Sequence, residues 1–303
     1  FGVDPDQVTI SGESAGSQDV SLLLAAPQAR GLFRAAIMQS GTPGFGQSFR
    51  SLEEGFKLGD QLDELAQSGG DVATLRALSP VALLALQEKL TDPAASSGTP
   101  WLRATIDGKV LPDAPDRLLA QRPPLPVIVG TNTVEFGPGK GSVDLQGFAR
   151  SWYGDKGAAA LAAYQAEEVA GPNPRAGHLE LRFTSDAEFI CPANRLASHL
   201  VGLGWKVWRY EFDGSDPDKL TAHAREIGYV LGRKPVGGVQ MQDYWVALAK
   251  GLDPNAPLGD ASSRVKWPQL TGKRPTTLKF GNEATKAERG QPRSAFCGYS
   301  SAF

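Results

Sequence analysis

Continuous apolar runs mark where the chain is expected to form buried strands. Three short runs stand next to glycine, serine or proline: Val8–Ile10, Ala35–Met38 and Pro126–Val129. Such runs are typical of parallel strands that are covered on both faces. Residues 207–212 alternate instead, which predicts one strand face formed by Trp208, Tyr210 and Phe212.

Between these runs, apolar side chains recur at the intervals of an amphipathic helix. Helices are expected after residue 20 and at 52–66, 75–90, 155–169, 192–202 and 242–252. The apolar faces of 52–66 and 75–90 are expected to point into the core. Alternating strands and helices without an internal repeat predict an α/β protein, in which helices wrap a mostly parallel sheet.

The segment Gly12-Glu13-Ser14-Ala15-Gly16 fits the pattern G-x-S-x-G and lies between the first expected strand and the helix after it. In serine hydrolases this pattern places the serine on a strained turn above the carboxyl end of the strand. The N–H of Ala15 would then be one donor of an oxyanion hole, and the helix start would favour negative charge there. A glycine-rich turn capped by a serine is the purely structural alternative.

The segments FGVDPDQVTISGESAGSQDVSLLL and GLFRAAIMQSG closely resemble type-B carboxylesterases, the group that includes cholinesterases. Further landmarks of this family follow in the family's order: DGKVLPDAP, VIVGTNTVEFG, FICPANRLASHL, TAHAREIGYVLG, MQDYWVALAKGLDPN and VKWPQL. The resemblance implies the α/β-hydrolase fold and the hydrolysis of carboxylic esters through an acyl-enzyme.

A serine hydroxyl needs a base within hydrogen-bond reach, and the base needs an acid that orients it. His223 lies in a loop-like segment after the alternating strand, where the base of this fold belongs, and the resemblance matches it to the family's base. His178 and His199 are expected to be surface or core residues. Glu135 follows the third apolar run and matches the family's acid, in the chain order serine, acid, histidine. An exposed strand-end carboxylate is the alternative.

Three polar residues match positions that support the reaction in the family. Glu13 stands beside the nucleophile and corresponds to a glutamate near the bound substrate. Ser40 and Glu226 correspond to positions in the hydrogen-bond network behind the acid and the base. A purely structural polar contact is the alternative for each.

Aromatic residues are the candidates for the substrate pocket. Trp101, Phe136 and Trp152 are expected to line an acyl or alcohol pocket, with a place in the core as the alternative. The chain also departs from the family here. Val134 and Phe136 replace the usual Asp and Gly beside the acid, and Ala224 replaces the Gly after the histidine. These departures concern the shape of the pocket more than the triad.

Cys191 and Cys297 are the two cysteines of the chain, and their spacing fits neither a zinc site nor a redox motif. The resemblance implies a disulfide between them, and two reduced buried cysteines are the alternative. A disulfide would indicate an extracellular or periplasmic location, because such bonds persist in oxidising compartments.

The family's oxyanion hole needs further N–H donors from a glycine-rich loop. The chain holds no His-Gly-Gly stretch, and Gly237-Gly238 comes after the histidine. The resemblance therefore implies that residues 1–303 form the C-terminal portion of a single α/β-hydrolase domain. An N-terminal portion on the order of 120–200 residues would supply the loop.

Composition excludes other classes of function. Lys and Arg number 31 and Asp and Glu 33, for a net charge of -2, which argues against a nucleic-acid binder. No apolar stretch approaches the ~18 residues of a membrane span. The resemblance implies no metal and no organic cofactor, and a small-molecule ester as substrate. The alternatives are a non-catalytic binding or adhesion module of the same fold, and an amidase or thioesterase with the same triad.

Overall fold

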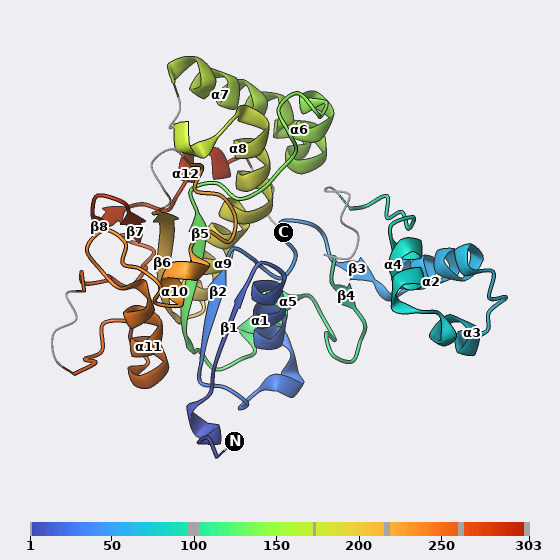
Figure 1. Ribbon diagram of the computed structural model, residues 1–303, viewed down its shortest axis with the longest axis horizontal. Helices are drawn as coiled ribbons and strands as arrows, with labels where there is room; N and C mark the ends of the chain where they lie inside the picture. Colours follow the sequence, from blue (N-terminus) through green and yellow to red (C-terminus); the bar gives the residue numbers. More distant parts are fainter. Residues whose placement is uncertain (1, 96–102, 172–173, 215–218, 260–263, 300–303) are drawn as a thin grey trace.

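A six-stranded sheet forms the centre of the part of the chain that the structure describes (Figure 1). The computed structural model describes residues 2–95, 103–171, 174–214, 219–259 and 264–299. The sheet has the order β1-β2-β5-β6-β7-β8. Its strands are β1 (Thr9–Glu13), β2 (Ala35–Gln39), β5 (Pro126–Asn132), β6 (Lys206–Asp213), β7 (Thr276–Gly281) and β8 (Thr285–Arg289). All neighbours pair in parallel except β7 and β8, so the predicted mostly parallel sheet is confirmed.

Helices cover both faces of this sheet. Along β5, Val127 and Val129 pack into one apolar cluster and Ile128 into the other. The first cluster is closed by α1 (Ala15–Ala25), α5 (Pro115–Ala120) and α9 (Cys191–Gly202), the second by α10 (Ile227–Val230) and α11 (Met241–Gly251). The second cluster also contains the three aromatic residues predicted to share one face of β6, which confirms that alternation.

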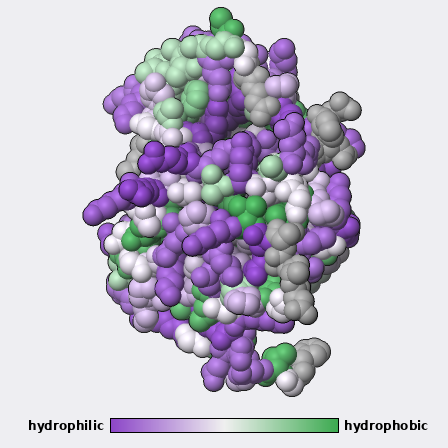
Figure 2. All heavy atoms as spheres, turned by 90° about the vertical axis from the view of Figure 1, so that its left-hand side faces the viewer, coloured by the Kyte–Doolittle hydropathy of each residue, from purple (hydrophilic) through white to green (hydrophobic). Residues whose placement is uncertain are grey.

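A helical lobe stands over the carboxyl ends of the strands, at the top of Figure 1. It consists of α6 (Leu145–Tyr153), α7 (Gly157–Ala170) and α8 (Leu179–Ser185), with α12 (Ser294–Cys297) beside it. Aromatic rings fill its interior, with Tyr153 and Tyr164 packed on Phe183. Figure 2, seen from the side of β7 and β8, shows a mostly hydrophilic surface with a paler apolar cap over this lobe.

A second group of helices corrects one sequence prediction. α2 (Leu52–Ala66), α3 (Val72–Ala77) and α4 (Pro80–Gln87) were expected to face the core, but they contain no buried residue. Phe56 is 62% exposed and Leu84 60% exposed. The helices project away from the sheet, and α2 packs on α4 (Figure 1). The single helix predicted at 75–90 is interrupted because Ser79 caps a new helix that begins at Pro80.

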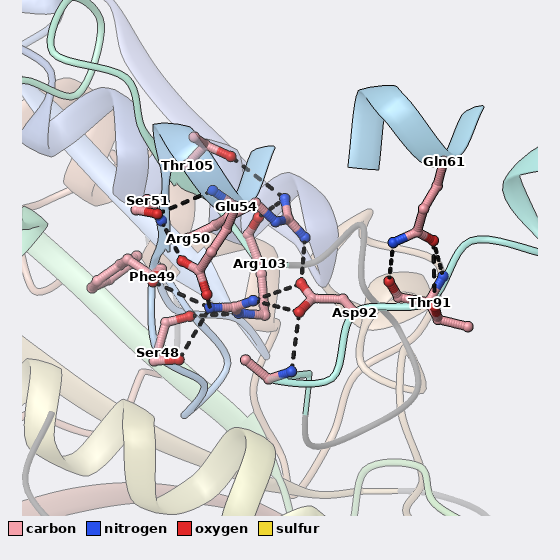
Figure 3. A network of polar contacts seen from close by, with 11 residues as sticks. Ser48, Phe49, Arg50, Ser51, Glu54, Gln61, Thr91, Asp92, Arg103 and Thr105 are labelled. Atoms are coloured by element: carbon pink, nitrogen blue, oxygen red, sulfur yellow. Dashed lines mark hydrogen bonds and ion pairs between the residues drawn. The ribbon is translucent and has the colours of Figure 1, made fainter. Parts of the chain in front are cut away.

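Buried arginines attach this projecting group to the body of the protein (Figure 3). Arg103 donates to both carboxylate oxygens of Asp92, at 2.7 and 2.6 Å, and to the carbonyl of Ser48 at 3.0 Å. Arg50 donates to the same carboxylate at 2.9 Å. Arg50 belongs to β3 (Arg50–Ser51), which pairs with β4 (Thr105–Ile106). The planar guanidinium group of arginine suits such paired contacts. These contacts hold together the segment that leads into the projecting helices and the segment that leads back from them.

Candidate active site

Ser14 occupies the sharp turn between β1 and α1. Its backbone has φ 57° and ψ -122°, a conformation that a residue with a side chain rarely adopts. The turn is held by the bond from the N–H of Ser14 to the carbonyl of Gln39, at 2.9 Å. A Cβ at Gly12 would lie 2.2 Å from the carbonyl oxygen of Gly16, so the turn requires glycine at position 12. A Cβ at Gly16 would meet no described atom within 4 Å, so the second glycine is not required sterically.

Ala15 is the first residue of α1 and is exposed. The N–H groups of a first helical turn have no carbonyl partner within the helix. They also carry the positive end of the helix dipole. The N–H predicted as an oxyanion donor therefore lies where negative charge beside Ser14 would be stabilised.

Glu135 and His223 are joined by side chain and backbone. Nδ1 of His223 lies 2.7 Å from Oε2 of Glu135, and the N–H of His223 donates to the carbonyl of Glu135 at 3.2 Å. Glu135 is 1% exposed. The alternative of an exposed strand-end carboxylate is therefore wrong. A carboxylate on Nδ1 fixes the ring orientation and leaves Nε2 free to exchange a proton with a substrate or nucleophile.

The other oxygen of Glu135 is held just as firmly. Oε1 accepts from the hydroxyl of Ser40 and from the N–H of Asn132, both at 2.8 Å. The hydroxyl of Ser185 in turn accepts from the N–H of Glu135 at 2.9 Å. The acid thus has a fixed position, with a partner on each carboxylate oxygen.

Glu226 lies behind this pair, fully buried. Its carboxylate accepts from the side-chain amides of Gln39 at 3.1 Å and Asn132 at 2.9 Å. Gln39 accepts in turn from the indole N–H of Trp245 at 2.9 Å. Burial raises the pKa of Glu226, and the nearby charge of Glu135 raises it further. The network connects the ends of β2 and β5 to the segment that carries His223.

Glu13, the residue before Ser14, faces His223. Its Oε1 lies 3.2 Å from Nε2 of His223, and neither atom has a hydrogen-bond partner among the described residues. Burial raises the pKa of Glu13 to about 7, although the imidazole opposes this shift. Burial lowers the pKa of His223, but the bond and the charge of Glu135, with Glu13 and Glu226, outweigh it and leave that pKa above its ordinary value.

The predicted pocket aromatics have different surroundings. The ring of Phe136 lies 5.4 Å from that of His223 and is 44% exposed. Trp152 is buried in the core of the helical lobe, 6.1 Å from Phe148, so the structure places it with the lobe's interior rings. Trp101 lies outside the described residues.

The two other histidines have structural contacts. His178 caps α8 and lies 2.9 Å from Glu180. His199 contacts the carbonyl of Asp116 at 3.2 Å, on the far part of α9. These contacts agree with the prediction that neither residue belongs to the reaction centre.

A disulfide joins Cys191 to Cys297, as the resemblance implies. Near it, Nε of Arg293 donates to Asp186 at 2.7 Å. Asp186 begins η6 (Asp186–Ile190), a π-helical segment between α8 and α9. The C-terminal part of the chain is therefore tied at two points to the helical segment that passes His223.

Sequence reasoning missed several residues of this site. Asn132, Ser185 and Gln39 hold the acids, and the ring of Phe189 lies 5.1 Å from that of His223. Asn132 and Gln39 end buried strands, and this position was the available signal. Ser185 and Phe189 gave none, because only the packing of α8 and η6 on the sheet brings them here.

Comparisons with known proteins show which proteins this chain is similar to. Residues 1–146 match the model of the carboxylesterase family. Para-nitrobenzyl esterase of Bacillus subtilis (strain 168) is 27% identical, over 94% of this chain and 60% of the relative. Acetylcholinesterase of Leptinotarsa decemlineata is 26% identical, over 99% of this chain and 54% of the relative. The chain thus spans about half to three-fifths of the length of these curated relatives.

Solved structures share the fold. A Geobacillus stearothermophilus carboxylesterase superposes with a TM-score of 0.74 at 25% identity, over 99% of this chain and 65% of the other. A thermophilic para-nitrobenzyl esterase superposes with a TM-score of 0.73 at 23% identity, over 99% of this chain and 64% of the other. The chain therefore has the α/β-hydrolase fold, and its residues 1–146 are similar to the carboxylesterase family.

Proposed function

We propose that the protein hydrolyses carboxylic esters through Ser14, His223 and Glu135. The contact that carries the proposal is the 2.7 Å pairing of Glu135 with Nδ1 of His223, while Nε2 lies 3.2 Å from Glu13, the residue before Ser14. Ser14 attacks the ester carbonyl while His223 accepts its proton. Glu135 stabilises the imidazolium and does not take the proton itself.

The remaining steps use the same groups. The tetrahedral intermediate carries a negative oxygen, which the N–H of Ala15 and the start of α1 stabilise. His223 then protonates the leaving alcohol, and Ser14 is left acylated. Water, deprotonated by His223, attacks the acyl group, the bond to Oγ of Ser14 breaks, and His223 returns the proton to Ser14 as the acid leaves. The net reaction converts one ester and one water into one alcohol and one carboxylic acid.

We further propose that residues 1–303 are the C-terminal portion of one α/β-hydrolase domain that works with an N-terminal portion. β1 pairs only with β2 among the described strands, so one edge of the strand that leads to Ser14 lacks a described partner. A parallel strand there, followed by a glycine-rich loop, would complete the oxyanion hole. The incomplete coverage of the relatives supports this arrangement.

The test of the hydrolase compares Ser14→Ala with the natural protein on 4-nitrophenyl acetate. Turnover should fall by about 10⁴-fold or more, because the nucleophile is lost. Labelling by an organophosphate should disappear in the same variant. Ser151→Ala, at an exposed serine of α6, is the control and should keep both properties. Full labelling and turnover in Ser14→Ala would contradict the proposal.

The same substrates discriminate the other classes. Equal rates on matched ester and amide substrates would favour an amidase, and binding of an ester without turnover would favour a non-catalytic module. Both outcomes would contradict an esterase.

We propose an extracellular or periplasmic location, because the Cys191–Cys297 disulfide suits an oxidising compartment. Within the described ranges, none of the helices combines the length and apolar character needed to cross a membrane. Alkylation of free thiols in a freshly prepared extract tests the state of the two cysteines. Rapid labelling of both would contradict this location.

A further inference from the structure

Phe136 holds an aromatic ring against His223 and leaves much of that ring open to solvent. The ring centroids of Phe136 and His223 lie 5.4 Å apart, with 61° between the planes. Phe189 lies behind both, 5.3 Å from Phe136 and 5.1 Å from His223. Phe189 is 1% exposed, whereas Phe136 is 44% exposed. The two phenyl rings thus form an apolar wall beside the base, and only its outer member reaches solvent.

The backbone that carries Phe136 is held on both sides. Glu135 before it is buried and bonded through both carboxylate oxygens and its N–H. Gly137 after it packs so closely that an added Cβ would lie 2.9 Å from Cβ of Thr184 in α8. A side chain on such a support presents its surface in a fixed place, which reduces the entropy lost when a ligand binds.

The chemistry of the proposed reaction determines which part of an ester meets this wall. His223 must protonate the leaving oxygen, so that oxygen lies within hydrogen-bond reach of Nε2. The alcohol group attached to the oxygen therefore lies beside the imidazole. Phe136 contacts that imidazole and is exposed, so it is placed to contact the alcohol group rather than the acyl group.

Building on the proposed ester hydrolysis, we propose that Phe136 determines specificity for the alcohol part of the substrate and favours alcohols that carry an aromatic ring. A phenyl ring buries apolar area on this wall, as any hydrocarbon of that size does. It also gains from the offset or edge-to-face geometry that two aromatic rings adopt. A saturated ring of similar size has only the first contribution.

The experiment measures kcat/KM for benzyl acetate and cyclohexylmethyl acetate, whose alcohols are both primary and similar in size. It uses the natural protein that carries this chain and its Phe136→Leu variant. The benzyl-to-cyclohexylmethyl ratio should fall roughly three- to tenfold in the variant, the range expected for an aromatic pair. Phe136→Tyr keeps the ring and should keep the ratio. Phe56→Leu, at an exposed phenylalanine of α2, is the matched control.

A second pair of esters tests whether Phe136 contacts the alcohol group or the acyl group of the substrate. The ratio for methyl phenylacetate over methyl cyclohexylacetate should stay unchanged in Phe136→Leu, because their rings belong to the acyl group. A change in this ratio instead would overturn the assignment to the alcohol. An equal loss on all four esters would overturn it too, since Phe136 would then only support His223. If the natural protein hydrolyses none of them, the proposed function itself fails, and the specificity proposal with it.

Discussion

Oε1 of Glu13 lies 3.2 Å from Nε2 of His223, the nitrogen that would exchange protons with Ser14. A second carboxylate therefore acts on the imidazole from the side opposite Glu135. Two carboxylates beside one imidazole stabilise its protonated form. Both carboxylates should therefore influence the pH dependence of the reaction.

Glu13→Gln should shift the acid side of the pH–rate profile to lower pH. Glu13 ionises as pH approaches its own pKa of about 7, and its charge then helps to raise the pKa of His223, whose neutral imidazole is the form that acts as base. Removing the charge lowers that pKa, so more of the base is neutral at acidic pH. The profile of kcat/KM on 4-nitrophenyl acetate measures the shift. An unchanged or higher apparent pKa would contradict it, and Glu53→Gln on exposed α2 is the control.

Glu13 should also make stability depend on pH. Its pKa is raised from 4.5 to about 7, so the folded chain holds a proton that the unfolded chain has released. The stability associated with this proton is present at low pH and is lost as pH rises from 4.5 to about 7. Glu13→Gln should therefore raise the free energy of unfolding above that of the natural protein most near pH 8, and only a little near pH 4.5. Urea unfolding at both values measures the difference, and an equal gain at both would refute the linkage.

Ser40→Ala should slow turnover by roughly ten- to a hundredfold. The change removes one of the two donors to Oε1 of Glu135, and hydrogen bonds to charged groups contribute about 1.5–3 kcal/mol. Kinetics on 4-nitrophenyl acetate would detect the loss of turnover. Ser151→Ala, which removes an exposed hydroxyl bonded to the carbonyl of Phe148, should not change turnover.

Ala224→Gly should stabilise the protein. Ala224 follows His223 with φ 64°, in the left-handed region that disfavours a Cβ. Glycine relieves this strain, and the free energy of unfolding should rise by about 1 kcal/mol. Ala222→Gly is the matched control, two residues away without positive φ, and it should lose about 0.5–1 kcal/mol. A loss in both variants would show that no strain resides at 224.

Replacing both cysteines by alanine should lower the free energy of unfolding by about 4 kcal/mol. The Cys191–Cys297 bond closes a loop with a sequence separation of 106, and long loops restrict the unfolded chain most. Thermal unfolding with and without reductant measures the effect. Reductant should lower the Tm of the natural protein and leave that of the variant unchanged, and the reverse pattern would be inconsistent with a formed bond.

Sequence patterns predicted the strands well where burial on both faces makes them continuous. The run predicted at Pro126–Val129 forms most of β5, and Glu135 follows shortly after the end of that strand. Periodicity failed for α2 and α4, because an apolar stripe indicates a partner but does not say whether that partner is the central sheet. The contacts of Glu135 with Ser185 could not be predicted, since they arise only when distant segments pack.

The π-helical segment η6 has a consequence for how this chain tolerates change in length. It interrupts a continuous helical run from α8 to α9, with Phe189 inside it and Cys191 directly after it. Deleting one residue there would remove the wide turn and change the directions of side chains in and beside it. The ring of Phe189 beside His223 and the sulfur of Cys191 that binds Cys297 would then both be displaced. The disulfide and the ring beside His223 therefore depend on the same helical register.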